Sequence, residues 1–168
     1  MSEPIREIIP ENEVELKIVP EKEENIPMAW HGALVKVLLW LEMILHLAQA
    51  AMIFSGKIYL ASSVRAAVYA GLPAMCIVDY AFAAALAAAA VLLFLARKKL
   101  AARKCGGIKL LLSAYILLPA AWICYGAARF LIAGLSPFSN PAIGQCIAWL
   151  ALLLVNRSYY SKRAGMFQ

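Results

Sequence analysis

The chain has 168 residues and a mass of 18.3 kDa, with 64% hydrophobic side chains, 15% charged side chains and a mean hydropathy of +0.75. Soluble domains carry about 25% charged and about 45–50% apolar residues. This composition argues against a cytosolic enzyme, a secreted disulfide scaffold and a nucleic-acid-binding domain. Four long apolar runs, each near the roughly 20 residues that cross a bilayer, predict an all-α, four-helix transmembrane bundle.

The first 29 residues form an acidic tail. Eight of the ten acidic residues lie within the first 24 positions, where only Arg6, Lys17 and Lys22 oppose them. Four prolines up to position 27 block a stable helix, and the high charge prevents burial of a core, so we expect a disordered tail. The alternating segment 13–19 leaves a second interpretation open, a strand that docks on a partner's sheet edge. The tail lacks the positive start and early apolar core of a signal peptide.

Residues 30–168 are expected to form a four-span transmembrane domain. A helix on the membrane surface, capped by Ser62 or Ser63, is expected between the first two spans. The alanine-rich segment 81–90 of the second span predicts close packing at the bundle centre, because small residues let helix backbones approach in lipid. The expected spans cover residues 33–54, 73–95, 108–135 and 141–160, of which the last is interrupted by Gln145, Asn156 and Arg157.

The distribution of Lys and Arg predicts the orientation. Six of them gather around the connection between the second and third spans, counting Lys109 at the start of the third, and the C-terminal flank holds Arg157, Lys162 and Arg163. The connection between the first two spans holds two, and the last connection holds none. Because cytoplasmic loops carry the excess of Lys and Arg, both termini are expected in the cytoplasm. The lipid bilayer is the expected surrounding of the four spans.

A polar stripe follows one face of the first span. Glu42, His46 and Gln49 recur at i, i+4 and i+7, which places them within a narrow arc of a helix. Placing an ionisable side chain at membrane depth costs about 2.5–3.5 kcal/mol on insertion scales, so each such residue is expected to have a structural or functional role. Glu42 and His46 could share a proton or a hydrogen bond across one turn. Lys36, the nearest cation in sequence, lies on another face of the helix.

A second polar layer is expected in the outer half of the bundle. Asp79 lies about 9 Å into its span, and Arg129 lies at nearly the same depth in the third span. We expect these two side chains to form an ion pair, since pairing removes most of the cost of burial. Gln49 and Gln145 should lie in the same layer. The pair could fix helix register as structural glue or form part of a functional site.

Residues for cofactor or catalytic chemistry are not evident. The four cysteines, at positions 76, 105, 124 and 146, form no C-x-x-C motif, and the chain has only two histidines. Structural zinc needs about four clustered ligands. His31 and His46 are roughly 22 Å apart along a helix, too far to ligate one haem. Hydrolase and nucleotide-binding motifs are also missing, so we expect no catalytic residue, metal, cofactor or nucleic-acid partner, and no enzyme activity.

The order of four spans, a basic central connection and the ending 156–167 (NRSYYSKRAGMF) resembles the small four-span inner-membrane proteins of unknown function that are common in bacteria. The resemblance implies a bacterial inner-membrane protein and implies no activity. Small multidrug transporters also have four spans and a carboxylate in the first span. They are shorter, however, and this chain carries no other motif of theirs.

Two functional hypotheses follow. The leading one is a non-enzymatic accessory or interaction subunit of a membrane complex, which docks on a membrane protein through the tail or the bundle surface. The alternative is a small proton-coupled permease or channel that works as a homo-oligomer. In that case Glu42 would be the coupling group, His46 its relay, and Asp79 with Arg129 an outer gate.

Overall fold

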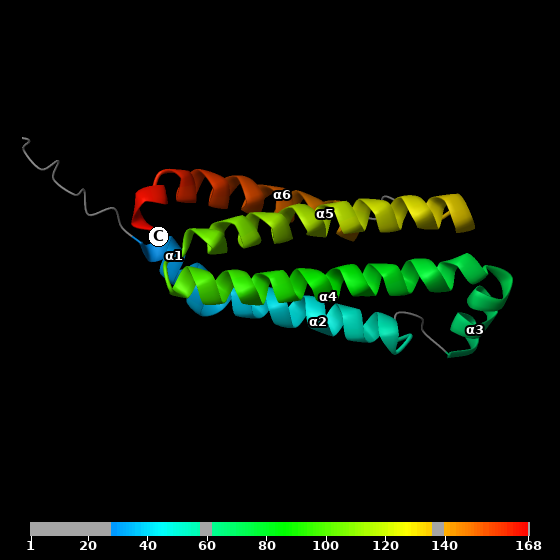
Figure 1. Cartoon of the computed structure of the whole chain (residues 1–168). Helices are drawn as coiled ribbons and strands as arrows, with labels where there is room; N and C mark the ends of the chain where they lie inside the picture. The colour runs from blue at the N-terminus through cyan, green and yellow to red at the C-terminus, as the bar shows by residue number, and fades with distance from the viewer. Residues whose placement is uncertain (1–27, 58–61, 136–139, 168) are drawn as a thin grey trace, which may run out of the picture.

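A computed structural model describes residues 28–57, 62–135 and 140–167, and these residues form helices and no strand. One continuous rod begins the fold and consists of α1, a π-helical segment and α2 (Figure 1). The remaining helices follow in an antiparallel arrangement. The elements are α1 (Ala29–Ala33), the π-helix η1 (Leu34–Leu38), α2 (Leu39–Phe54), α3 (Ser62–Gly71), α4 (Pro73–Ala101), α5 (Cys105–Ala133), α6 (Asn140–Ser161) and the 3-10 turn η2 (Ala164–Met166).

Three of these helices are long and apolar enough to cross a membrane: Ala29–Phe54, Pro73–Ala101 and Cys105–Ala133. The chain is therefore consistent with a multi-pass membrane protein. α6 has 22 residues but is not among the three. α6 is less apolar than the other three because Gln145, Asn156 and Arg157 lower its mean hydropathy.

α4 lies at the centre of the packing and contacts α2 on one side and α5 on the other. Its buried face alternates small and large apolar side chains, among them Ala83, Leu86, Ala89 and Leu93. Small residues allow the neighbouring backbones to approach, and the larger ones fill the space between them. The central position expected for the alanine-rich helix is confirmed.

The turn between α4 and α5 is shorter than the sequence suggested. The six basic residues were expected in a loop, but Arg97, Lys98 and Lys99 belong to α4 and Lys109 belongs to α5. Only residues 102–104 connect the two helices. Gly107 makes this possible, since a Cβ at that position would come within 2.8 Å of the Leu100 backbone nitrogen.

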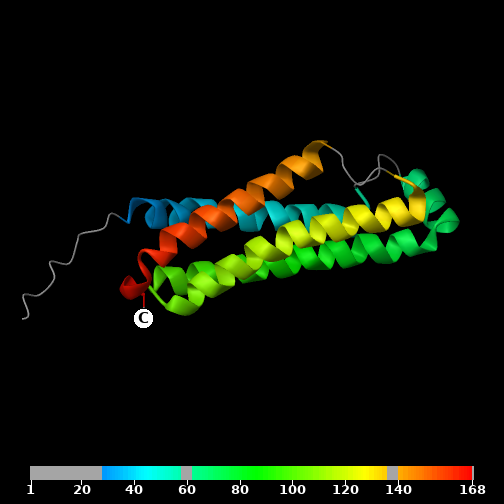
Figure 2. The same ribbon diagram turned by 90° about the horizontal axis from the view of Figure 1, so that it is seen from above.

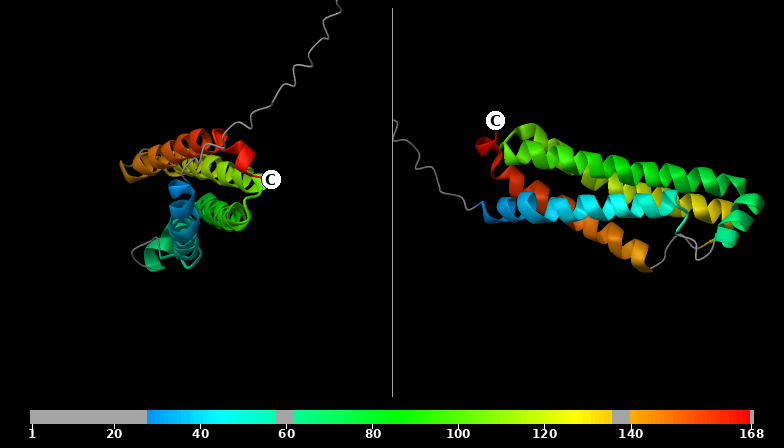
Figure 3. Two further views of the ribbon diagram at one scale, coloured as in Figure 1. Left: turned by 90° about the vertical axis from the view of Figure 1, so that its left-hand side faces the viewer. Right: turned by 90° about the horizontal axis from the view of Figure 1, so that it is seen from below.

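α6 follows α5 for only part of its length. Its C-terminal half lies along the bundle, while its N-terminal half diverges from α5 (Figures 2 and 3). The divergence leaves an apolar groove of about 810 Å³ between the two helices. The groove is lined by Trp122, Ile123, Ala127, Phe130, Leu131, Ala142, Ile143, Cys146, Ile147 and Leu150.

The helix expected between the first two spans is present as α3, which packs against α4. The chain breaks at Leu72, and Pro73 occupies the first turn of α4, where a missing N–H costs nothing. The helix was expected over residues 58–72, and residues 58–61 lie outside the described residues. The same holds for residues 1–27, so the expected disorder of the acidic tail stays a prediction.

The beginning of the first helix and the end of the chain meet at one end of the molecule, next to the α4–α5 turn (Figure 1). Trp30 Nε1 donates to Asn156 Oδ1 at 3.1 Å, and the His31 ring nitrogen Nδ1 lies 2.9 Å from the Tyr160 hydroxyl. The His31 ring also contacts Phe167 edge to face. These contacts tie α1 to α6, and they explain why the helix begins at Ala29 rather than near the expected residue 33.

Candidate functional site

The polar stripe of the first helix points into the molecule. Glu42 is 5% exposed, His46 is 1% exposed and Gln49 is half-buried. The stripe begins one turn after the π-helical segment, whose wider turn breaks the regular backbone hydrogen bonding. Arg97 of α4 contacts this region: its Nε donates to the Val35 carbonyl at 3.0 Å, and its guanidinium carbon lies 4.4 Å from the Trp40 ring centre. This contact joins α4 to the π-helical segment that precedes the stripe.

Glu42 has a neutral partner. The Tyr115 hydroxyl of α5 lies 3.1 Å from one carboxylate oxygen and 3.0 Å from the other. Tyr115 is fully buried, and its single proton can serve only one oxygen at a time. Among the described residues Glu42 forms no ion pair. A buried carboxylate without a cation is costly, so this environment stabilises the neutral, protonated carboxyl.

His46 lies one turn beyond Glu42 but does not bond to it. Its Nδ1 lies 3.3 Å from Gln49 Oε1, and its buried Nε2 has no hydrogen-bond partner among the described residues. The sequence-based idea of a direct Glu42–His46 hydrogen bond is therefore wrong for this conformation. The physical reason is that each side chain has a nearer partner, Tyr115 for Glu42 and Gln49 for His46.

Trp149 of α6 closes this cluster. Its ring centre lies 5.0 Å from that of His46 and 5.9 Å from that of Tyr115. One aromatic side chain thus links α2, α5 and α6 at the level of Glu42. Sequence reasoning missed Tyr115 and Trp149, although each is an aromatic residue with a polar atom deep inside an apolar run, where such an atom needs a partner. We call Glu42, His46, Gln49, Tyr115 and Trp149 the central polar cluster.

A second polar group lies nearer the other end of the molecule, around the fully buried Asp79. The Tyr125 hydroxyl of α5 donates to Asp79 Oδ1 at 2.8 Å, and the Tyr69 hydroxyl of α3 donates to Oδ2 at 2.9 Å. Asp79 therefore joins α3, α4 and α5. The Tyr69 contact also fastens the short α3 to the bundle.

Arg129 belongs to the same region through Tyr125. Its guanidinium carbon lies 5.5 Å from the centre of the Tyr125 ring, so Tyr125 contacts both members of the expected ion pair. The direct Asp79–Arg129 ion pair stays a prediction. Arg129 Nε and Gln145 Oε1 are buried, and within the described part of the chain neither atom has a hydrogen-bond partner.

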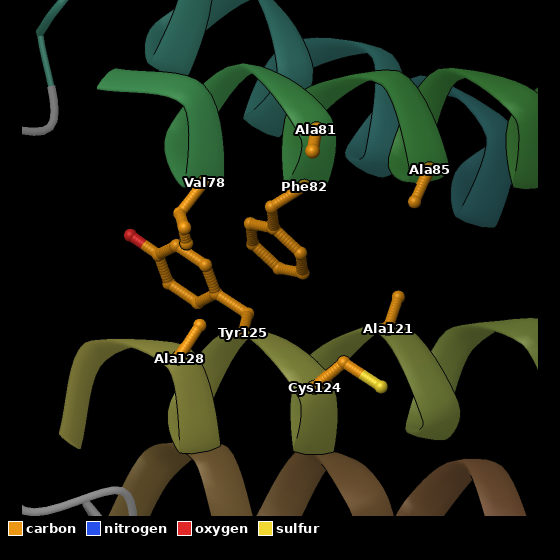
Figure 4. A pocket seen from close by; sticks show the side chains of 8 residues that line it. All are labelled: Val78, Ala81, Phe82, Ala85, Ala121, Cys124, Tyr125 and Ala128. Carbon is orange, nitrogen blue, oxygen red and sulfur yellow. The ribbon is translucent and has the colours of Figure 1, made fainter. Parts of the chain in front are cut away.

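Tyr125 also borders a small apolar hollow of about 240 Å³ between α4 and α5 (Figure 4). Its ring stacks on Phe82 at 4.2 Å, and alanines from both helices line the rest of the hollow. Cys124 lies at the rim. The four cysteines are free thiols, and within residues 28–57, 62–135 and 140–167 no three His, Cys, Asp or Glu side chains lie close enough to hold a metal.

Comparison with known proteins adds no relative: no protein-family model, no curated protein and no solved structure matches this chain. The function has to be argued from the described residues.

Proposed function

We propose that the protein is a four-span integral membrane protein of a bacterial inner membrane, with both termini in the cytoplasm. α6 is long enough to span, at about 33 Å for its 22 residues. Its apolar stretch is bounded by Gln145 and Asn156, and both of these polar residues are buried or half-buried rather than directed at lipid. The start of α1 and the end of α6 lie beside the basic α4–α5 turn, which supports a common cytoplasmic side.

The function that the geometry supports best is proton binding and transfer by a small proton-coupled permease or channel. The observation that carries this proposal is the environment of Glu42, a nearly fully buried carboxyl whose hydrogen-bond donor is a neutral hydroxyl. A carboxyl that serves only as structural glue would be expected to find a cation or several donors. A carboxyl that must accept and release a proton needs a partner that tolerates both forms, and a tyrosine hydroxyl can donate to one and accept from the other.

The remaining members of the central polar cluster could pass the proton on. The free Nε2 of His46 can accept a proton, and its Nδ1 is already oriented by Gln49. Glu42 lies roughly 6 Å along the helix from His46, so a water molecule or a change of rotamer would have to bridge them. Asp79, with Tyr69 and Tyr125, would be the next proton-binding group toward the end of the molecule opposite the chain termini. Because four helices enclose little space, the pathway would be completed by a second copy of the chain.

The direct test is proton flux in proteoliposomes with a pH-sensitive dye inside. Glu42→Gln keeps the size and the hydrogen-bonding oxygen but cannot release a proton, so the flux should fall at least tenfold. Lys36→Gln, which removes an exposed charge from the same helix, should leave the flux unchanged. A wild-type flux equal to that of empty liposomes, or full flux in Glu42→Gln with unchanged melting temperature, would reject the proposal.

A second candidate is the accessory subunit of a membrane complex, and one specific observation favours it. The apolar groove between α5 and α6 has a volume of about 810 Å³, and Leu131, one of its lining residues, is 81% exposed, so apolar side chains of a partner helix could pack there. Native mass spectrometry of the complex, extracted from its own membrane in mild detergent, separates the two candidates. A stoichiometric foreign subunit would favour the accessory role, whereas a homo-oligomer alone would favour the permease.

A further inference from the structure

The charges on the surface of the described residues are all of one sign. After residue 27 the chain carries 13 Lys and Arg against two acids, Glu42 and Asp79. Both acids are buried in the interior, where tyrosine hydroxyls bind them. The described part of the chain therefore offers no exposed carboxylate to neutralise its exposed cations.

The cations gather at the end where α1 begins, α4 ends, α5 begins and α6 ends (Figure 1). Ten of the 13 lie within seven residues of one of these helix ends, which corresponds to about 10 Å along a helix axis. We call this set the basic end. Its members are Lys36, Arg97, Lys98, Lys99, Arg103, Lys104, Lys109, Arg157, Lys162 and Arg163.

Most of these side chains are available for a partner. Lys98, Lys99, Lys104 and Lys109 are exposed on the surface. Two others are partly used inside the molecule, since Arg97 bonds the Val35 carbonyl and Arg163 lies over the Tyr159 ring. The exposed lysines face the medium, so the basic end is open to an anionic partner from outside the described residues.

We propose that this partner is the acidic N-terminal segment of the same chain, residues 1–27. Eight glutamates against three basic residues give the segment a net charge of −5, opposite to that of the basic end. The segment joins the described structure at Met28, directly beside the basic end. Its 27 residues can extend about 90 Å at most, which is more than the roughly 25 Å width of a four-helix bundle.

Tethering favours this occupant over a free anion. A short connection gives the segment a millimolar effective concentration at the basic end, so even weak ion pairs would keep it bound. Each exposed pair contributes little alone, but eight carboxylates opposite ten cations act together. The bound segment would shield the basic end from anionic lipid headgroups and from other acidic partners. This inference does not depend on a role of Glu42 in proton transfer.

Zero-length carbodiimide crosslinking of the full chain, followed by peptide mass spectrometry, tests the contact. The protein is placed in nanodiscs of phosphatidylcholine, so that no anionic lipid competes. We expect crosslinks from the tail glutamates to Lys98, Lys99, Lys104 and Lys109, and none to Lys57 at the opposite end. They should fall at least tenfold in 1 M NaCl, where the screening length is about 3 Å. A variant with all eight tail glutamates changed to glutamine is the matched control and should lose them.

Three results would overturn the proposal. The first is an absence of these crosslinks while the four lysines react normally with an amine reagent. The second is crosslinks between copies, detected by mixing light and heavy isotope-labelled protein, because they would assign the tail to a neighbouring molecule. The third is loss of the crosslinks when the nanodiscs contain phosphatidylglycerol, because anionic lipid would then be the occupant in a membrane.

Discussion

The hydrogen bond between Tyr115 and Glu42 can be measured by a double-mutant cycle. Tyr115→Phe removes only the hydroxyl, and Glu42→Met removes the carboxyl while keeping an unbranched side chain of similar length. Interhelical hydrogen bonds in membrane proteins average about 0.6 kcal/mol and reach about 1.7 kcal/mol. Bonds to a charged acceptor contribute about 1.5–3 kcal/mol. Because the site holds a neutral carboxyl in our proposal, we expect a coupling energy of about 0.6 kcal/mol.

The assay is the free energy of unfolding in mixed micelles, titrated with a denaturing detergent, for the wild type, both single variants and the double variant. Tyr115→Phe combined with Trp30→Phe serves as the control pair, since these sites share no contact and their effects should add. A coupling above about 1.7 kcal/mol, beyond the range of interhelical hydrogen bonds in membrane proteins, would show a charged acceptor and refute the proton-bound form of Glu42. A coupling of zero would show that the two side chains do not bond.

Two further predictions concern packing. Gly107→Ala should destabilise the protein by about 1–3 kcal/mol, because the new methyl group would meet the Leu100 backbone nitrogen at 2.8 Å. Gly106→Ala is the control: its methyl group would meet only the flexible end of the Lys99 side chain, at 3.4 Å, so the melting temperature should stay unchanged or rise slightly. Equal melting temperatures for the two variants would contradict the close approach of α4 and α5. Trp30→Phe should cost about 1 kcal/mol by removing the 3.1 Å hydrogen bond to Asn156, and an unchanged free energy of unfolding would show that this bond does not hold α1 to α6.

Several features of this protein follow from local sequence alone. The length of the apolar runs predicts helices, because a segment in lipid must satisfy its backbone hydrogen bonds internally. The alanine-rich segment predicts which helix lies at the centre, since only small residues permit close approach on two sides. The periodicity of Glu42, His46 and Gln49 predicts one polar face of the first helix. Each of these inferences uses residues close together in the chain. The structure agrees with the helices and with the central place of α4, and it adds that the polar stripe is directed into the molecule.

The partners of the polar residues could not be derived in this way. Periodicity places Glu42 on a face of its helix, but its hydrogen bond to Tyr115 joins residues 73 positions apart and depends on how α5 is rotated against α2. The same holds for Asp79, because its hydrogen bonds to Tyr69 of α3 and Tyr125 of α5 could not be derived from depth along the helix. Depth along a helix can be counted from sequence, whereas rotation about the helix axis is decided by packing.

The sequence by itself determined the helical character, the polar stripe on one helix face and the separation of an acidic N-terminal segment from a basic remainder, because these depend on composition and on spacing within one segment. Only the tertiary structure decided that the central carboxyl faces a tyrosine, that the α4–α5 turn shrinks to three residues, and that the first and last helices meet beside it. Those features arise from contacts between helices, where side-chain volume and hydrogen-bonding geometry select one arrangement among several that the local pattern allows.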